Sequence, residues 1–266
     1  MVNHPYRIAS FSSKINYYKI FSIDRKNGGG KSPKPKFDIH VHFENSSQEY
    51  EVFIGDRREC VLIFIPKNNP DKIATLQSFN YHSICSIDKN LKKGSGTKRM
   101  MKKTLQFIKK KFNIKKVELR DNSYIYCSIL KNINPVERNI EVPILNIYML
   151  YIFTHGNPYY VHNFGFNFTN NKIKKINRMN RKIVKNIKIN NKLLKDLKNM
   201  FKIYEIKDER KKYFFSKLKK YENIRDFIRN ENIKDKCDLF FVLIKRLFSL
   251  YGIQDLTGEC YYINME

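Results

Sequence analysis

The stretch Phe79–Asp121, FNYHSICSIDKNLKKGSGTKRMMKKTLQFIKKKFNIKKVELRD, carries the strongest signals for the fold. Its first residues, FNYHSICSI, predict a strand, and a glycine pair then begins a helix that ends near Phe112. One face of this helix is apolar at helical spacing, and the other is almost entirely lysine. The last residues, IKKVELRD, return to a strand. A strand–helix–strand crossover predicts a parallel pair within the sheet.

Upstream of this stretch the hydrophobic period changes to two. FDIHVHFE (37–44) and EYEVFIG (49–55) alternate, CVLIFIP (60–66) is a continuous apolar run, and polar turns separate the three. This pattern indicates an antiparallel meander. Together with the crossover, this meander predicts an α/β fold. Its sheet would be mixed, with antiparallel and parallel strands, which is also described as α+β.

Residues 1–36 end in a loop rich in glycine, proline and lysine. Its GGGKS resembles part of a phosphate-binding P-loop, but Arg25 occupies the position of the first glycine, so a flexible loop is the favoured interpretation. His40 and His42 fall on the same face of a predicted strand, a spacing that can bind metal. No third ligand is near them in the sequence, so we expect no metal site.

Downstream, residues 140–153 predict a buried helix, and residues 154–168 predict a loop, a short helix and a strand. Between residues 171 and 220 there are 19 Lys and Arg against four acids, yet apolar stripes recur at helical spacing. CDLFFVLIKRLFSLY (237–251) is apolar nearly all round, as in a core helix. We therefore expect three parts: an N-terminal segment (1–36), an α/β domain (37–170) and a basic helical extension packed on it (171–266).

The composition is that of a folded protein with a strong positive charge. The chain has 266 residues, 42% of them hydrophobic, and a net charge of +27. Its longest apolar run, residues 144–153, is about half of what a bilayer requires, and no signal peptide is evident. Five cysteines without a CxxC pair argue against zinc and, being odd in number, fit a reducing compartment. The expectation is a soluble intracellular protein without membrane contact.

The high positive charge can reflect the coding bias of the genome or a function in binding polyanions. Lys, Asn, Ile, Phe and Tyr are abundant while tryptophan is absent, a bias that AT-rich coding produces. Part of the lysine content then reflects the genome, although so strong a field still attracts polyanions.

The glycine pair is the clearest candidate for a binding site. Two glycines at the start of a helix allow several backbone N–H groups to point toward the same anion. The helix dipole adds partial positive charge at this position. Such a place suits a pyrophosphate, and lysines precede it. The predicted anion-binding residues are Lys92, Lys93, Gly94, Ser95, Gly96 and Thr97.

At these residues the sequence resembles the GNAT superfamily of acyl-CoA-dependent N-acetyltransferases. LKKGSG fits the family's Gln/Arg-x-x-Gly-x-Gly/Ala signature from its second position on, with Leu91 at the first. The strand KVELRDNS follows, and NPYYVHNFGF supplies a helix with Tyr160 before Gly165-Phe166. The same blocks resemble uncharacterised GNAT-like proteins of large DNA viruses. The resemblance covers about residues 37–168 and implies a GNAT-like fold with a C-terminal helical extension.

The resemblance implies direct transfer of an acetyl group from acetyl-CoA to an amine, with no metal. Backbone N–H groups around Cys85, Ser86 and Ile87 would hold the pantetheine arm and polarise the thioester carbonyl. Tyr160 would return a proton to the departing thiolate, although a core-packing role is the alternative. The candidates for the general base are Glu118, Asp121 and His155. Each has a structural alternative: Glu118 as a residue on the strand surface, Asp121 as a turn former, and His155 as a structural residue of a turn.

The sequence thus supports an acetyltransferase acting on an unidentified amine. The alternative is a catalytically inactive GNAT-like basic protein that binds nucleic acid non-specifically through its lysine-rich helices, or that serves as a virion component. A viral origin would place the protein in the host cytoplasm or in the virion. Lysine contacts phosphate as a point charge, so nucleic-acid binding would depend steeply on salt.

Overall fold

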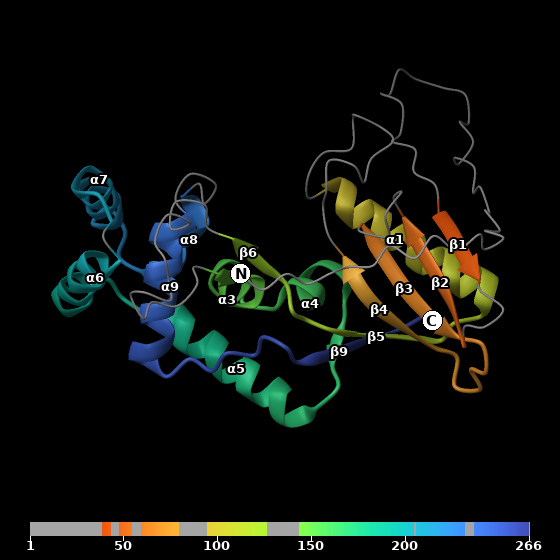
Figure 1. Ribbon diagram of the computed structural model, residues 1–266. Coiled ribbons are helices and arrows are strands. Elements are labelled where there is room, and N and C mark those ends of the chain that lie inside the picture. The colour runs from red at the N-terminus through yellow and green to blue at the C-terminus, as the bar shows by residue number, and fades with distance from the viewer. Residues whose placement is uncertain are drawn as a thin grey trace, which may run out of the picture. The chain divides into compact units, whose positions relative to one another are not determined.

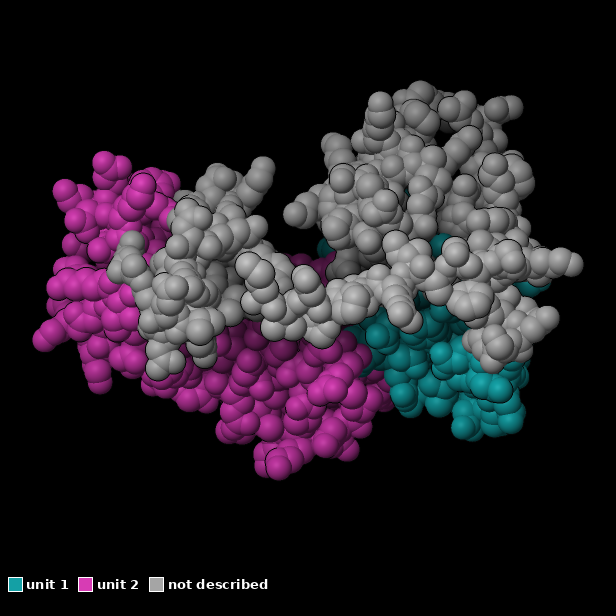
Figure 2. All heavy atoms as spheres, in the orientation of Figure 1, with its two compact units in different colours: residues 1–119, 263–266 teal, residues 120–262 magenta. Residues whose placement is uncertain are grey.

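The computed structural model describes residues 39–43, 48–54, 60–79, 95–126, 144–204, 206–231 and 237–265. The predicted N-terminal segment (1–36) lies outside these residues. The chain divides into two compact units, one of residues 1–119 with 263–266 and one of residues 120–262 (Figure 2). These units differ from the expected parts, which met at residue 170.

Seven strands form one mixed sheet in the order β1-β2-β3-β4-β5-β9-β8. In the first unit these include β1 (Ile39–Phe43), β2 (Glu49–Ile54), β3 (Val61–Pro66), β4 (Ile73–Phe79) and β5 (Lys116–Arg120) (Figure 1). Strands β1 to β4 pair antiparallel in sequence order, which confirms the predicted meander. Strand β5 pairs parallel to β4, which confirms the crossover and the mixed α/β sheet.

The fourth strand lies earlier in the chain than expected. Its residues are IATLQSF (73–79), whereas the sequence predicted Phe79–Ile87. Burial alternates along it, with Ala74 and Leu76 inside and Thr75 and Gln77 exposed. The expected residues 80–87 lie outside the part of the chain that the structure describes.

Helix α1 (Ser95–Phe112) packs on β2 and β3 through its apolar face (Figure 1). Met100, Met101, Leu105 and Ile108 are buried, and the hydroxyl of Thr104 is satisfied within the helix by the Met100 carbonyl at 2.9 Å. Three lysines fill the last turn, where positive charge interacts favourably with the helix dipole. The predicted amphipathic helix is thereby confirmed.

The second unit is mainly helical. A strand pair, β6 (Tyr124–Tyr126) and β7 (Ile144–Asn146), precedes helices α3 (Ile147–Thr154) and α4 (Tyr159–Phe164). Strand β8 (Asn167–Phe168) pairs antiparallel with β9 (Cys260–Asn264). Between these two strands the chain forms α5 (Asn171–Asn186), α6 (Asn191–Ile203), α7 (Asp208–Leu218), α8 (Ile224–Asn230) and α9 (Cys237–Tyr251).

The basic helices are therefore inserted between two neighbouring strands. The segment 171–266 is helical and packed, as expected, but it ends in strand β9 and so returns to the sheet. Sequence analysis treated this segment as an extension because β8 and β9 are about 90 residues apart, and local periodicity carries no sign of their pairing.

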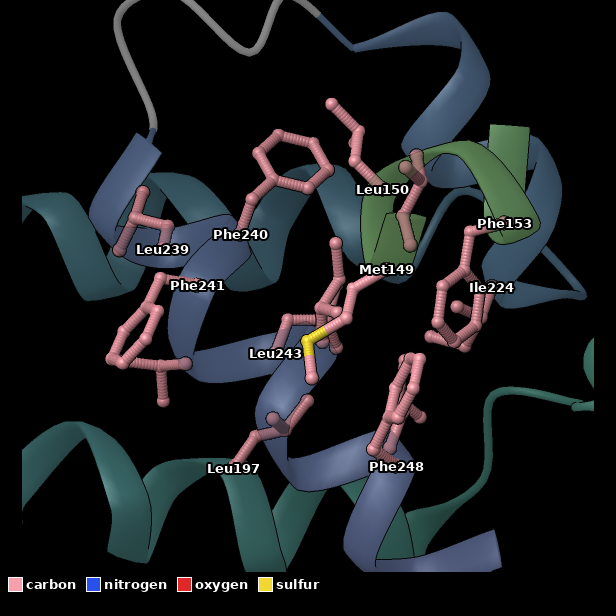
Figure 3. Packing of buried hydrophobic residues seen from close by; sticks show 14 of the residues in the cluster. Met149, Leu150, Phe153, Leu197, Ile224, Leu239, Phe240, Phe241, Leu243 and Phe248 are labelled. Atoms are coloured by element: carbon pink, nitrogen blue, oxygen red, sulfur yellow. The ribbon is translucent and has the colours of Figure 1, made fainter. Parts of the chain in front are cut away.

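Helix α9 forms the centre of the second unit's core. Phe240, Phe241, Leu243 and other residues of α9 are fully buried, and side chains from α3, α6 and α8 converge on them (Figure 3). The Phe240 ring stacks on that of Phe227 from α8, with centroids 5.7 Å apart. This confirms the prediction that residues 237–251 form a core helix.

Two further expectations concern the membrane and the cysteines. Within the described residues, no helix is long and apolar enough to cross a bilayer. Cys60 and Cys237 each belong to a disulfide bond, whereas Cys260 is a free and exposed thiol.

Candidate active site

A buried polar cluster in the second unit joins two residues that the sequence proposed to two that it did not. Asp121 follows β5 in the chain, Ser123 comes two residues later, Tyr160 belongs to α4, and Tyr261 lies in β9. Asp121 is 1% exposed, Tyr160 5% and Tyr261 0%. We refer to these four residues as the polar cluster.

The backbone of Asp121 is fixed by the turn that precedes β9. Its N–H donates to the Glu259 carbonyl at 3.1 Å, and its carbonyl accepts from the Gly258 N–H at 2.7 Å. The Arg120 Nε donates to the Gly258 carbonyl at 2.8 Å. Gly258 has φ +84°, a left-handed conformation that glycine adopts without strain. These main-chain hydrogen bonds fix the position of the Asp121 backbone, from which the carboxylate extends.

One oxygen of the Asp121 carboxylate has a partner and the other has none. Oδ1 accepts a hydrogen bond from the Ser123 backbone N–H at 3.0 Å. Oδ2 is buried without a hydrogen-bond partner. Burial raises the pKa of Asp121 above its ordinary value; hydrogen bonds from the Ser123 backbone and side chain oppose this effect, and the charge of Asp255 adds to it. The site therefore holds a carboxyl group that ionises less readily than one in water.

The Tyr160 phenol is linked to Asp121 through Ser123. The Tyr160 Oη and the Ser123 Oγ lie 3.3 Å apart. Burial raises the pKa of Tyr160 well above its ordinary value, the negative charge of Asp121 raises it further, and the bond to Ser123 partly opposes both. Tyr160 is therefore a protonated phenol at neutral pH, which can donate a proton but cannot act as a base there.

Tyr261 completes the polar cluster. Its hydroxyl is buried without a hydrogen-bond partner, and burial together with the charge of Asp121 raises its pKa far above the ordinary value. A buried hydroxyl and a buried carboxylate oxygen that both lack partners are costly, because each has lost water without a replacement. Sequence reasoning missed Tyr261 because it lies in a short strand; the run of strand-favouring residues in CYYIN was the available signal.

The other two candidates for the general base have different surroundings. Glu118 lies on β5 in the first unit and forms an ion pair with Lys116 at 2.6 Å, with its side chain 40% exposed. His155 follows α3 and is exposed. Its Nδ1 lies 2.7 Å from the Thr154 hydroxyl, and its ring stacks on Tyr151 at a centroid distance of 4.6 Å. Of the three candidates, Asp121 is the one that the structure connects to Tyr160.

The α4 helix ends in the Gly-Phe pair that the resemblance singled out. Gly165 caps the helix with φ +77°, and its N–H donates to the Val161 carbonyl. The buried Phe166 ring then packs edge-on against Tyr160 at 5.9 Å. The glycine turns the chain so that the following aromatic residue supports the tyrosine.

The predicted anion-binding residues are described only in part. Ser95, Gly96 and Thr97 form the beginning of α1, whereas Cys85, Ser86, Ile87, Lys92, Lys93 and Gly94 lie outside the described residues. The first turn of α1 contains no acid, and Lys98 and Arg99 follow it. The first N–H groups of a helix lack partners within the helix, so this beginning suits an anion such as a pyrophosphate.

A metal centre has no support in the described part of the chain. His42 is buried and its Nδ1 lies 3.2 Å from the Glu51 carboxylate on the neighbouring strand. Among the described residues no group of three or more His, Cys, Asp or Glu side chains could hold a metal ion.

Comparison of the chain with protein-family models, with curated proteins and with solved structures finds no match. Any statement about its activity therefore depends on its own residues and their geometry.

Proposed function

We propose that the protein has a GNAT-like fold and transfers an acetyl group from acetyl-CoA to an amine, with Tyr160 as the proton donor. The observation that carries this proposal is the buried Tyr160 phenol, which lies 3.3 Å from the hydroxyl of Ser123, a residue whose backbone N–H donates to Asp121. A phenol that stays protonated at neutral pH can donate its proton to the departing thiolate as negative charge develops on the sulfur.

The arrangement of the first unit supports the same proposal. Strands β4 and β5 are parallel neighbours joined through α1, which begins within GSGT. The acid-free start of α1 would bind the pyrophosphate of acetyl-CoA through backbone N–H groups. The sequence resemblance and the element order both support an anion site at the start of α1.

In the proposed reaction the nitrogen of the amine attacks the carbonyl carbon of the thioester. The bond from carbon to sulfur breaks, the thiolate takes the Tyr160 proton, the proton lost by the amine passes to solvent, and Tyr160 regains a proton from solvent. The Ser123 hydroxyl orients the phenol, and the Ser123 backbone N–H donates to Asp121, whose raised pKa lets this carboxyl hold a proton more readily than one in water. Asp121 is thus a positioning residue in this scheme.

The test is release of the CoA thiol from acetyl-CoA in the presence of a polyamine, a lysine-containing peptide or an aminoglycoside. Tyr160→Phe should slow thiol release ~10²-fold while leaving acetyl-CoA affinity nearly unchanged, because only the donated proton is lost. The matched control is Tyr159→Phe, which removes a phenol hydroxyl from the same helix. Equal rates for the wild type and Tyr160→Phe would assign the proton transfer to another group.

A further inference from the structure

Helix α5 has an unusual concentration of positive charge. It contains seven Lys and Arg residues and no acid, and all seven side chains are exposed. The buried residues of the helix, Asn177, Asn180 and Val184, lie on its opposite side. The seven cations are Lys172, Lys174, Lys175, Arg178, Arg181, Lys182 and Lys185.

Four of these cations form a straight row, which we call the α5 stripe. Lys174, Arg178, Arg181 and Lys185 are spaced i, i+4, i+7 and i+11, so they fall on one face of the helix. At 1.5 Å per residue the row is about 16 Å long. Within the described residues none of the four forms an ion pair. Like charges at this spacing repel one another, and a bound polyanion would remove that repulsion.

Exposed aromatic rings adjoin the stripe. His155 and His162 are both exposed, with ring centroids 4.3 Å apart. Arg181 lies beside the turn that carries His155, since a Cβ built on Gly156 would be 3.5 Å from the Arg181 Nε. The stripe therefore leads directly to a surface of two imidazole rings.

The choice between polyanions follows from what α5 does not expose. A helix that binds a membrane surface needs an apolar face for the lipid, but the apolar face of α5 is packed against α3 and α8. A nucleic acid needs only cations for its phosphates, and arginine can contact phosphate in a bidentate manner. Aromatic rings add affinity for a strand whose bases are accessible.

We propose that the α5 stripe and the His155–His162 rings form a binding surface for single-stranded nucleic acid, without base specificity. Phosphates contact the stripe and a base packs on the exposed rings. This inference is independent of the acetyltransferase proposal, because it uses neither α1 nor the polar cluster.

The test is fluorescence anisotropy of the full chain with a labelled oligothymidylate of about 20 nucleotides, long enough for the ~4–16-nucleotide sites common in such proteins. Reversal of the stripe, K174E/R178E/R181E/K185E, should weaken binding at least tenfold. Four lost phosphate contacts should also reduce the slope of log affinity against log salt by about three, at roughly 0.7 per contact. H155A/H162A should weaken binding of the oligothymidylate several-fold and leave binding of a duplex unchanged.

The control for charge alone is K192E/K195E/K202E/K212E, which changes the net charge equally at four exposed lysines of α6 and α7. It should bind within about threefold of the wild type with the same salt slope. Three results would overturn the inference: an equal loss in this control, a duplex bound as tightly as the single strand, or phosphatidylserine vesicles bound as tightly as the oligonucleotide. Circular dichroism of each variant verifies that the fold is intact.

Discussion

At the scale of single residues, Ser123 contacts both Tyr160 and Asp121, the two groups of the proposed chemistry. The Ser123 hydroxyl lies 3.3 Å from the Tyr160 hydroxyl, and the Ser123 backbone N–H donates to the Asp121 carboxylate at 3.0 Å. The Ser123 backbone is fixed by the same carboxylate. A small residue in a turn thereby determines how the phenol is oriented.

Ser123→Ala should lower kcat about tenfold with little change in acetyl-CoA affinity, because the phenol remains but loses its orientation. The double variant S123A/Y160F should be no slower than Y160F alone, since both changes remove the same function. The control is Ser249→Ala, at an exposed position of α9. If the two fold reductions in the rate of thiol release multiply in the double variant, Ser123 and Tyr160 act separately.

Asp121 predicts a specific dependence of stability on pH. Burial raises its pKa in the folded state above the ordinary value of 3.8, so the folded protein binds this proton more tightly than the unfolded chain. The ionised carboxylate therefore costs stability, and this cost appears as the pH rises from the unfolded pKa through the folded one. Below the unfolded pKa the cost is absent.

Asp121→Asn should accordingly raise the melting temperature at pH 7, and the difference from wild type should vanish around pH 3. The measurement is thermal unfolding followed by circular dichroism across this pH range. The exposed Asp226→Asn of α8 serves as the control. A variant that is less stable than wild type at pH 7 would mean that the carboxylate is stabilised by its surroundings.

Sequence reasoning reached half of the polar cluster. The Tyr-to-Gly-Phe block located Tyr160, and the end of a strand located Asp121. Ser123 is the last residue of the quoted KVELRDNS and had no assigned role, and Tyr261 lies more than 100 residues from all three. Contacts between distant segments depend on how strands pair. The residue types and spacings around a single position do not encode that pairing.

At the scale of elements, a buried asparagine attaches α5 to its surroundings. The Asn180 Nδ2 lies 2.8 Å from the Tyr148 hydroxyl on α3 and 2.7 Å from the Gln254 carbonyl. The Gln254 N–H donates back to the Asn180 Oδ1 at 3.1 Å. Asn180 thereby connects the helix that carries the basic stripe to α3 and to the loop before β9.

Asn180→Ala should destabilise the protein by about 2–3 kcal/mol, because it leaves buried polar groups without partners. Unfolding in urea measures the change. The matched control is Asn186→Ala on the same helix, where the exposed amide bonds only to the Lys182 carbonyl and the loss should be small. Equal effects of the two substitutions would show that the buried contacts contribute nothing beyond helix propensity.

Elements with a strong local period were predicted correctly. The meander, the amphipathic α1 and the apolar α9 can each be identified from the hydrophobic pattern of a short window of sequence. Strand β4 was not predicted because IATLQSF is short and nearly half polar, and the neighbouring FNYHSICSI has an equally strand-like composition. Strand β9 was missed because it follows a long series of helices and pairs with strands far away in the chain.

At the scale of the whole molecule, the second unit has a core of its own. All residues of its hydrophobic cluster lie between Leu145 and Leu256, and both strands of the β8–β9 pair begin within it. A segment that buries its own apolar residues can fold without the rest of the chain. The polar cluster and the α5 stripe both belong to this unit.

A fragment of residues 120–262 should therefore fold by itself, with a helical circular-dichroism spectrum and one cooperative thermal transition. The substitution Phe240→Ala, in the centre of its core, should lower the stability of the fragment by about 3–5 kcal/mol. A broad transition without cooperativity in the unsubstituted fragment would show that this unit requires residues of the other.

The central claim is that the protein binds acetyl-CoA through the start of α1, and isothermal titration calorimetry of the full chain with acetyl-CoA tests it most directly. The wild type should bind one equivalent with micromolar affinity. Gly96→Glu should abolish binding, because its carboxylate would repel the pyrophosphate, while a negative charge at a helix start leaves the helix stable. Gln106→Glu adds the same charge at an exposed position of α1 and should bind normally. Absence of binding to the folded wild type, or equal affinity in Gly96→Glu, would contradict the claim.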